Sequence, residues 1–248
     1  MLAVRVCARL DVKPTLGVVK GVRFEGLRVV GPVHELAARY EAHGADEILY
    51  LDITASLYGR PMSLDTVRRL ATELTIPLTV GGGVRTLDDV RAVMRAGADK
   101  VAINTGAFAD PGLIRAAARM VGSQAIVASI ESKRCDRDHE PYTLGGRERT
   151  GWKLADWIAR VVEDGAGEVL LTSIDRDGTR QGYDFLLPRG LPVPVVVSGG
   201  AGHPAHCVAA LMVGADAVAV GTILHDGTTT IGAIKQHLQE DGINVRLA

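Results

Sequence analysis

Two glycine-rich segments of this chain have the composition of phosphate-binding loops. Residues 78–84 read LTVGGGV and residues 195–201 read VVVSGGA. Glycines at the end of a strand let backbone N–H groups approach a ligand, and a following helix N-terminus favours an anion. Tight turns alone would be the simpler explanation for either segment. The residues expected to bind phosphate are Gly82, Gly83, Asn104 and Thr105 in one set, and Ser198, Gly199, Gly200, Gly221 and Thr222 in the other.

The spacing around these glycines repeats without a gap. Gly82 lies 15 residues before Gly97, and Gly199 lies 15 residues before Gly214. The pairs 104–105 and 221–222 begin seven residues after Gly97 and Gly214, respectively. Such a match indicates an internal repeat with halves of roughly residues 1–122 and 123–248. Two anion sites in register predict a ligand with a phosphate group at each end. The alternative is a duplicated scaffold that kept no duplicate function.

Two carboxyl groups are also in register between the halves. Asp11 lies in LDVK and Glu131 in IESK, each near the end of an expected strand. Opposed carboxyls beside a substrate can act as general acid and general base when their surroundings separate their pKa values. The alternative is a solvated carboxylate at a strand end. Asp52 and Asp177 are further acids on the same side, although an Asx turn would explain Asp177 equally well.

Apolar runs alternate with segments of helical period along the whole chain. This rhythm, in a chain of 248 residues, predicts one (β/α)8 barrel over residues 1–248, with phosphate and catalytic groups at the C-terminal ends of the strands. A doubly wound sheet is the alternative, but no G-x-G-x-x-G turn follows the first strand. The prolines of residues 175–194 predict a shortened sixth helix. The expected strands are residues 4–10, 47–53, 78–80, 101–104, 125–130, 169–174, 195–198 and 217–220.

Charged residues stand at the opposite, N-terminal ends of four of these strands. They are Arg5, Glu47, Lys100 and Glu168, two bases and two acids. Their alternating signs would allow a closed ionic ring. The simpler explanation is that charges end strands where water begins.

Composition excludes several classes of protein. The net charge of −1 argues against nucleic-acid binding through bulk charge, and no apolar run is long enough for a membrane span. The N-terminus does not resemble a signal peptide. Three widely spaced cysteines predict neither a disulfide framework nor a metal site, which favours the cytoplasm. His203 and His206 have no third ligand nearby, so no metal is expected.

Several motifs together resemble one family over essentially the whole chain, the cyclase subunit of imidazole glycerol phosphate synthase. The sister isomerase of histidine biosynthesis shares the half-barrel repeat, but the strings DITAS and TSIDRDGT favour the cyclase. The motifs are LDVK at 10–13, VVKG at 18–21, LDITAS at 51–56, VGGG at 80–83, ADKVAINT at 98–105, LTSIDRDGT at 171–179, SGGAG at 198–202 and the ending VRL at 245–247.

The resemblance implies a reaction and a partner. Ammonia from a separate glutaminase subunit would cross the barrel and react with a phosphoribulosyl-formimino aminoimidazole carboxamide ribonucleotide, which carries two phosphates. Imidazole glycerol phosphate and the aminoimidazole carboxamide ribotide would be released, without a cofactor. The resemblance implies an acid/base pair, matched by Asp11 and Glu131, and substrate contacts from Lys20, Thr172, Asp177 and Gly178. It also implies an ammonia gate at the four-residue ring and a partner contact at Asp99.

The chain departs from the family pattern at three places. Glu131 replaces an aspartate, Arg9 stands where the family usually has cysteine, and the segment after the sixth strand is short. Three hypotheses follow. The chain is the histidine-pathway cyclase, or a paralogue that passes ammonia to another phosphorylated or nucleotide-linked substrate, or a non-catalytic barrel that regulates a glutaminase.

Overall fold

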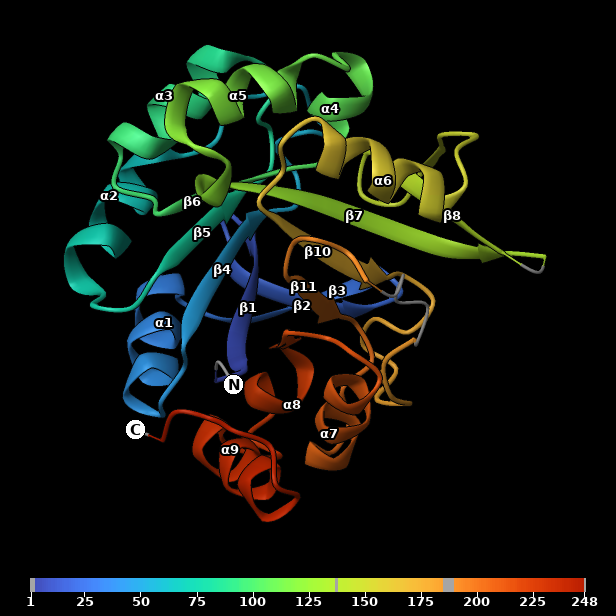
Figure 1. Cartoon of the computed structure of the whole chain (residues 1–248). Helices are drawn as coiled ribbons and strands as arrows, with labels where there is room; N and C mark the ends of the chain where they lie inside the picture. The colour runs from blue at the N-terminus through green and yellow to red at the C-terminus, as the bar shows by residue number, and fades with distance from the viewer. Residues whose placement is uncertain (1–2, 137, 185–189, 248) are drawn as a thin grey trace.

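A closed barrel of parallel strands forms the centre of the molecule (Figure 1). The computed structural model describes residues 3–136, 138–184 and 190–247. Each barrel strand pairs in parallel with the next, and pairing of β12 with β1 closes the ring. The predicted fold class is confirmed. In order around the barrel the strands are β1 (Arg5–Lys13), β4 (Glu47–Asp52), β5 (Leu78–Gly81), β6 (Lys100–Ile103), β7 (Ile126–Cys135), β10 (Glu168–Ser173), β11 (Val195–Ser198) and β12 (Ala217–Val220).

Alternate side chains of these strands enter two different apolar layers. Cys7, Leu49 and Ala219 belong to a small cluster, whereas their neighbours Val6 and Ala8 belong to the large core. Successive strand residues point to opposite faces. Both faces are therefore buried, which explains why the strands read as continuous apolar runs rather than alternating ones.

Helices pack around the outside of the barrel. Thr86 begins one of them with a capping box, in which its side chain and that of Asp89 each accept a hydrogen bond from the other's backbone N–H. The helices are α1 (Val33–Ala42), α2 (Leu64–Glu73), α3 (Leu87–Arg95), α4 (Thr105–Ala109), α5 (Leu113–Val121), α6 (Leu154–Glu163), α7 (Pro204–Met212), α8 (Thr222–His225) and α9 (Ile231–Glu240), with a 3-10 turn η1 at Ser123–Ala125.

The connection from β10 to β11 was predicted to lack a full helix. Residues 174–184 and 190–194, which are the described parts of this connection, contain turns and bends but no helix. The prediction also covers residues 185–189, which lie outside the described residues. In the described parts, the chain therefore crosses between these two strands without the usual helix.

Two antiparallel hairpins extend the barrel strands and were not predicted. β1 continues into β2 (Gly17–Val22) and β3 (Glu25–Gly31), and β7 continues into β8 (Asp138–Thr143) and β9 (Glu148–Arg149). Asp11 and Glu131 consequently lie inside long strands, rather than at strand ends as predicted. Each half of the chain begins with such a hairpin, so the internal repeat extends beyond the glycine motifs.

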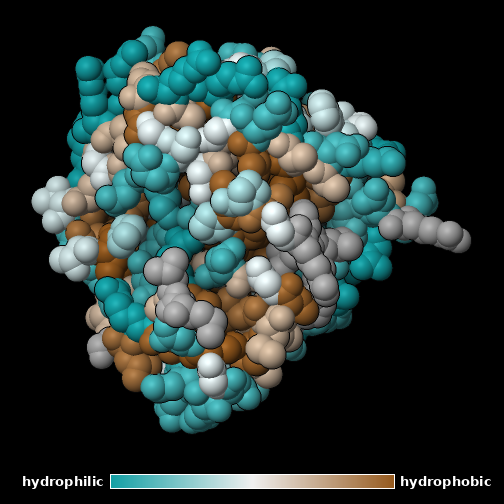
Figure 2. All heavy atoms as spheres, viewed as in Figure 1, coloured by the Kyte–Doolittle hydropathy of each residue, from teal (hydrophilic) through white to brown (hydrophobic). Residues whose placement is uncertain are grey.

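The outer surface is largely polar on the face seen in Figure 2, with apolar residues surfacing in patches between hydrophilic ones. None of the helices within the described ranges is long and apolar enough to cross a membrane.

Candidate active site

A cavity of about 150 Å³ opens where the barrel strands and both hairpins meet. Its wall includes the two carboxyl groups predicted from the repeat, Asp11 and Glu131, together with Lys20 and Asp177. Residues from both halves of the chain therefore share one pocket. The cavity lies at the C-terminal ends of the strands, where barrel enzymes place their active sites.

Asp11 is held between two cations. Its Oδ1 accepts a hydrogen bond of 2.8 Å from Arg9 Nε, and its Oδ2 accepts one of 3.0 Å from Lys20 Nζ. Burial of Asp11 opposes ionisation, but the charges and hydrogen bonds of Arg9 and Lys20 outweigh it and hold the pKa of Asp11 well below its usual range. Asp11 is thus an anion at every pH near neutrality.

Glu131 has the opposite electrostatic character. The pKa of Glu131 is raised to about 7, because burial and the nearby charges of Asp11 and Asp177 together outweigh the opposing charge of Arg9 and the hydrogen bond from Asn104. Its Oε2 accepts a hydrogen bond of 3.2 Å from Asn104 Nδ2. Glu131 can therefore exist as an acid or as a base at physiological pH.

Lys20 and Asp177 join the first hairpin to the loop after β10. Lys20 Nζ lies 2.8 Å from each carboxylate oxygen of Asp177. The backbone also connects them, because Arg23 N donates to Asp177 O at 2.8 Å. A Cβ added at Gly178 would lie 2.2 Å from the carbonyl oxygen of Gly21, so only glycine permits this close approach. The hairpin is therefore fastened over one side of the pocket.

Arg9 is the pocket residue whose function the sequence did not reveal. Its side chain is 3% exposed, and its Nη1 donates to Thr172 Oγ1 at 2.8 Å and to Ser198 Oγ at 3.0 Å. Arg9 stands two residues before Asp11 on β1, so both side chains point to the same face of the strand. That spacing was the available signal, and it indicates an inward-pointing cation next to the acid.

The first predicted anion site lines the main cavity. Gly82, Gly83, Asn104 and Thr105 all contribute to its wall. Gly82 and Gly83 have φ of 99° and 73°, and a Cβ on Gly82 would lie 2.1 Å from Asp52 O. Glycine is required for this turn, in which Gly83 N donates to Ser56 Oγ at 3.0 Å.

The second predicted anion site forms a smaller hollow beside the first, with a volume of about 10 Å³. Gly199 and Gly200 have φ of 91° and 111°, which matches the left-handed glycine pair of the first site. The two sites share the same backbone design, and Arg9 and Lys20 line both the main cavity and this hollow. Its remaining predicted residues, Ser198, Gly221 and Thr222, line the same hollow.

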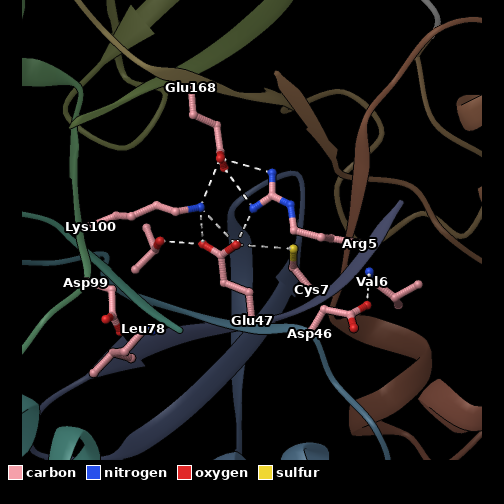
Figure 3. A network of polar contacts seen from close by, with 10 residues as sticks. Arg5, Val6, Cys7, Asp46, Glu47, Leu78, Asp99, Lys100 and Glu168 are labelled. Atoms are coloured by element: carbon pink, nitrogen blue, oxygen red, sulfur yellow. Dashed lines mark hydrogen bonds and ion pairs between the residues drawn. The ribbon is translucent and has the colours of Figure 1, made fainter. Parts of the chain in front are cut away.

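The four charged residues at the opposite end converge into a closed ring (Figure 3). Lys100 Nζ lies 3.1 Å from Glu47 Oε2 and 2.9 Å from Glu168 Oε2, and Arg5 contacts both glutamates as well. Glu47 and Glu168 are only 1% and 6% exposed. The explanation that these charges simply meet water at strand ends is therefore wrong.

Asp99, the residue expected at a partner contact, has a structural role in this chain. Its Oδ2 accepts a hydrogen bond of 2.8 Å from Leu78 N (Figure 3). Asp216 accepts one of 2.9 Å from Val195 N, and Asp46 does the same for Val6 N at 2.8 Å. Each of these aspartates follows Gly-Ala, so this recurring motif fastens the start of one barrel strand to the next.

Comparison with known proteins identifies the family. The model of a family described as histidine biosynthesis protein matches residues 5–230. The chain belongs to this histidine biosynthesis family. Family relatives include the "Imidazole glycerol phosphate synthase subunit HisF" of Myxococcus xanthus, 55% identical over 99% of both chains. The subunit of the same name from Pyrococcus furiosus is 46% identical over the full length of both, and that from Metallosphaera sedula is 49% identical over 98% of both.

In this histidine biosynthesis protein, His203 and His206 each make a hydrogen bond that has a structural role. His203 caps α7 by accepting from Ala205 N, and His206 Nδ1 accepts from Gly202 N at 3.1 Å. Within the described ranges, no three His, Cys, Asp or Glu side chains are grouped as they would be to hold a metal ion.

Proposed function

We propose that this chain is the cyclase subunit of an imidazole glycerol phosphate synthase. It combines ammonia with the phosphoribulosyl-formimino aminoimidazole carboxamide ribonucleotide and releases imidazole glycerol phosphate and the aminoimidazole carboxamide ribotide. Full-length identity of 45–55% to subunits of that name supports the proposal. Residues 1–248 act as one domain, since the barrel closes only when strands of both halves pair.

The observation that carries the proposal is the unequal pair of carboxyl groups in one pocket. Attack of ammonia on a carbonyl group makes the nitrogen acidic and the oxygen basic, so protons must leave one atom and reach the other. Asp11 supplies a fixed negative charge, and Glu131 can hold or release a proton near pH 7. The two groups are therefore assigned as the catalytic pair.

The paired glycine turns fit the two phosphates of this substrate. Gly82, Gly83, Asn104 and Thr105 would bind one phosphate, and Gly199, Gly200, Gly221 and Thr222 the other. Backbone N–H groups supply the hydrogen bonds at both ends, and Arg9 and Lys20 add positive charge near the second. Lys20, Thr172, Asp177, Gly178 and Ser198 complete the proposed substrate contacts.

The ionic ring at the far end is proposed as the gate for ammonia. It lies below an apolar cluster that includes Cys7, Ala102 and Ala219, whose small side chains line the barrel interior. A glutaminase subunit would dock over the ring, with Asp99 at its edge, and form a heterodimer with this chain. Three free cysteines support a cytoplasmic location.

Direct assay tests the activity. The purified chain is supplied with the bisphosphate substrate and a high concentration of ammonium, and imidazole glycerol phosphate is measured. Product formation is expected without the partner, because free ammonia can enter the pocket directly. Tight binding of the substrate with no turnover would reject the cyclase and favour a barrel that only regulates a glutaminase.

A further inference from the structure

Arg9 spans the interior of the barrel mouth. It starts from β1, whose barrel neighbours are β4 and β12, yet its guanidinium reaches Thr172 on β10 and Ser198 on β11. The guanidinium is planar and presents its donors in a fixed fork. Because two hydroxyl groups hold Nη1, the direction of the Nε–H bond is fixed as well. That bond points at Asp11 Oδ1, at an N–O distance of 2.8 Å.

The charges around Arg9 balance without Glu131. Arg9 and Lys20 are paired with Asp11 and Asp177, which makes two cations and two anions. All four side chains are buried, between 3% and 7% exposed. Among the described residues, it is the neutral amide of Asn104, rather than a lysine or arginine, that contacts Glu131. A further anion in this cluster is costly, so Glu131 is the carboxyl group that holds a proton.

We propose that Arg9 is a positioning residue for the proposed cyclase reaction: it fixes Asp11 as a permanent anion and leaves proton transfer to Glu131. Glu131 gives its proton to the carbonyl oxygen as ammonia attacks. The resulting carboxylate then takes a proton from the new ammonium nitrogen, so one proton moves from nitrogen to oxygen. Asp11 stays ionised throughout and stabilises the positive nitrogen. This inference rests on the proposed function for the identity of the reacting atoms.

Titration of Glu131 tests the inference without any turnover. Glutamate labelled with ¹³C at its carboxyl carbon is incorporated, and the Glu131 signal is assigned with Glu131→Gln and followed by NMR against pH. Removing the nearby cation in Arg9→Met should raise the midpoint by about one pH unit or more. Arg9→Lys keeps the positive charge and should return the midpoint most of the way to its value in the unaltered chain. Arg147→Met is the matched control, because it also removes a cation from the lining of this cavity. The groups that act on Glu131 are Arg9, Asp11, Asp177 and Asn104, so this variant should leave the midpoint unchanged. An unchanged midpoint in Arg9→Met would overturn the inference.

Kinetics supply the second readout. Turnover in Arg9→Met should persist to higher pH than in the unaltered chain, because Glu131 keeps its proton longer. Arg9→Lys keeps the charge but cannot hold Asp11 and both hydroxyl groups at once, so kcat should fall while KM changes little. If Arg9→Met does not fold, Arg9→Lys still tests the inference. A normal kcat in Arg9→Lys would overturn the positioning role of Arg9. A shifted titration in a chain without cyclase activity would retain the electrostatic role of Arg9 and reject the proposed function alone.

Discussion

Asp11 and Glu131 occupy matching positions in the two halves of the barrel, but their pKa values are displaced in opposite directions. Asp11 is buried and Glu131 is partly buried, so removal from water alone would raise the pKa of both. The difference comes from their neighbours: two cations contact Asp11, whereas an amide contacts Glu131. The same position in the two halves of the repeat therefore has two opposite electrostatic environments.

Removing the charge of Asp11 should abolish most of the activity. In Asp11→Asn we expect kcat with ammonium to fall by about 10²–10³-fold, the usual loss when a group that stabilises charge in the transition state is removed. Circular dichroism should show a folded barrel. Glu148→Gln, at an exposed carboxylate on β9, is the control and should behave normally. Near-normal turnover in Asp11→Asn would remove Asp11 from the mechanism.

The stability of the chain should depend on pH through Glu131. In the unfolded chain its pKa is 4.5, and in the folded chain it is about 7. Between these values the folded state holds more protons, so this contribution is complete below 4.5 and lost as pH rises through 7. The free energy of unfolding should fall by about 3 kcal/mol over this window. Urea unfolding of Glu131→Gln should lack this slope, and an identical slope in that variant would contradict the assignment.

Breaking the ionic ring should destabilise the barrel. Glu47 is 1% exposed and accepts hydrogen bonds from Arg5, Lys100 and Thr79. Glu47→Gln leaves two partly exposed cations with one carboxylate, and loss of the charged hydrogen bonds should cost about 1.5–3 kcal/mol. The midpoint of urea unfolding should shift accordingly. The ring would be structurally unimportant if Glu47→Gln changed that midpoint no more than Glu148→Gln.

The glycine turns should each bind one oxyanion. In Gly200→Ala the new Cβ would meet Gly182 O at 2.1 Å, which displaces the second turn. Crystals soaked in sulfate should then hold one anion at the barrel mouth instead of two. Substrate affinity should fall at least tenfold, because a hydrogen bond to a charged group contributes about 1.5–3 kcal/mol. Gly242→Ala is the control, as Gly242 has φ of 77° and open space around it. Two sulfates in Gly200→Ala would argue against the site.

Asp99 should matter to the isolated chain as well as to a complex. Asp99→Ala and Asp216→Ala each leave a buried backbone N–H without its acceptor, at a cost of about 1–3 kcal/mol. Both should lower the urea midpoint of the isolated chain by similar amounts. Only Asp99→Ala should also weaken binding of the glutaminase, measured by calorimetry. Equal binding by both variants would leave Asp99 with its structural role alone.

The sequence by itself determined the fold class and the repeated glycine turns. Both depend on local patterns: apolar strands buried on two faces, amphipathic helices between them, and glycines at matched spacing. The hairpin of residues 138–149 was missed because its strands are short and polar. The hairpin of residues 17–31 was missed because charged residues and glycines interrupt its valines. Asp11 and Glu131 were found because the repeat itself marks their positions.

Only the tertiary structure decided what these residues can do. Arg9 donates hydrogen bonds to Thr172 and Ser198, from which it is separated by 163 and 189 residues of sequence. No local pattern predicts such contacts. The burial of Glu47 and Glu168 in a ring likewise depends on strands from both halves. Ionisation responds to the charges within a few ångströms of a group, and the closing of the barrel is what selects those neighbours.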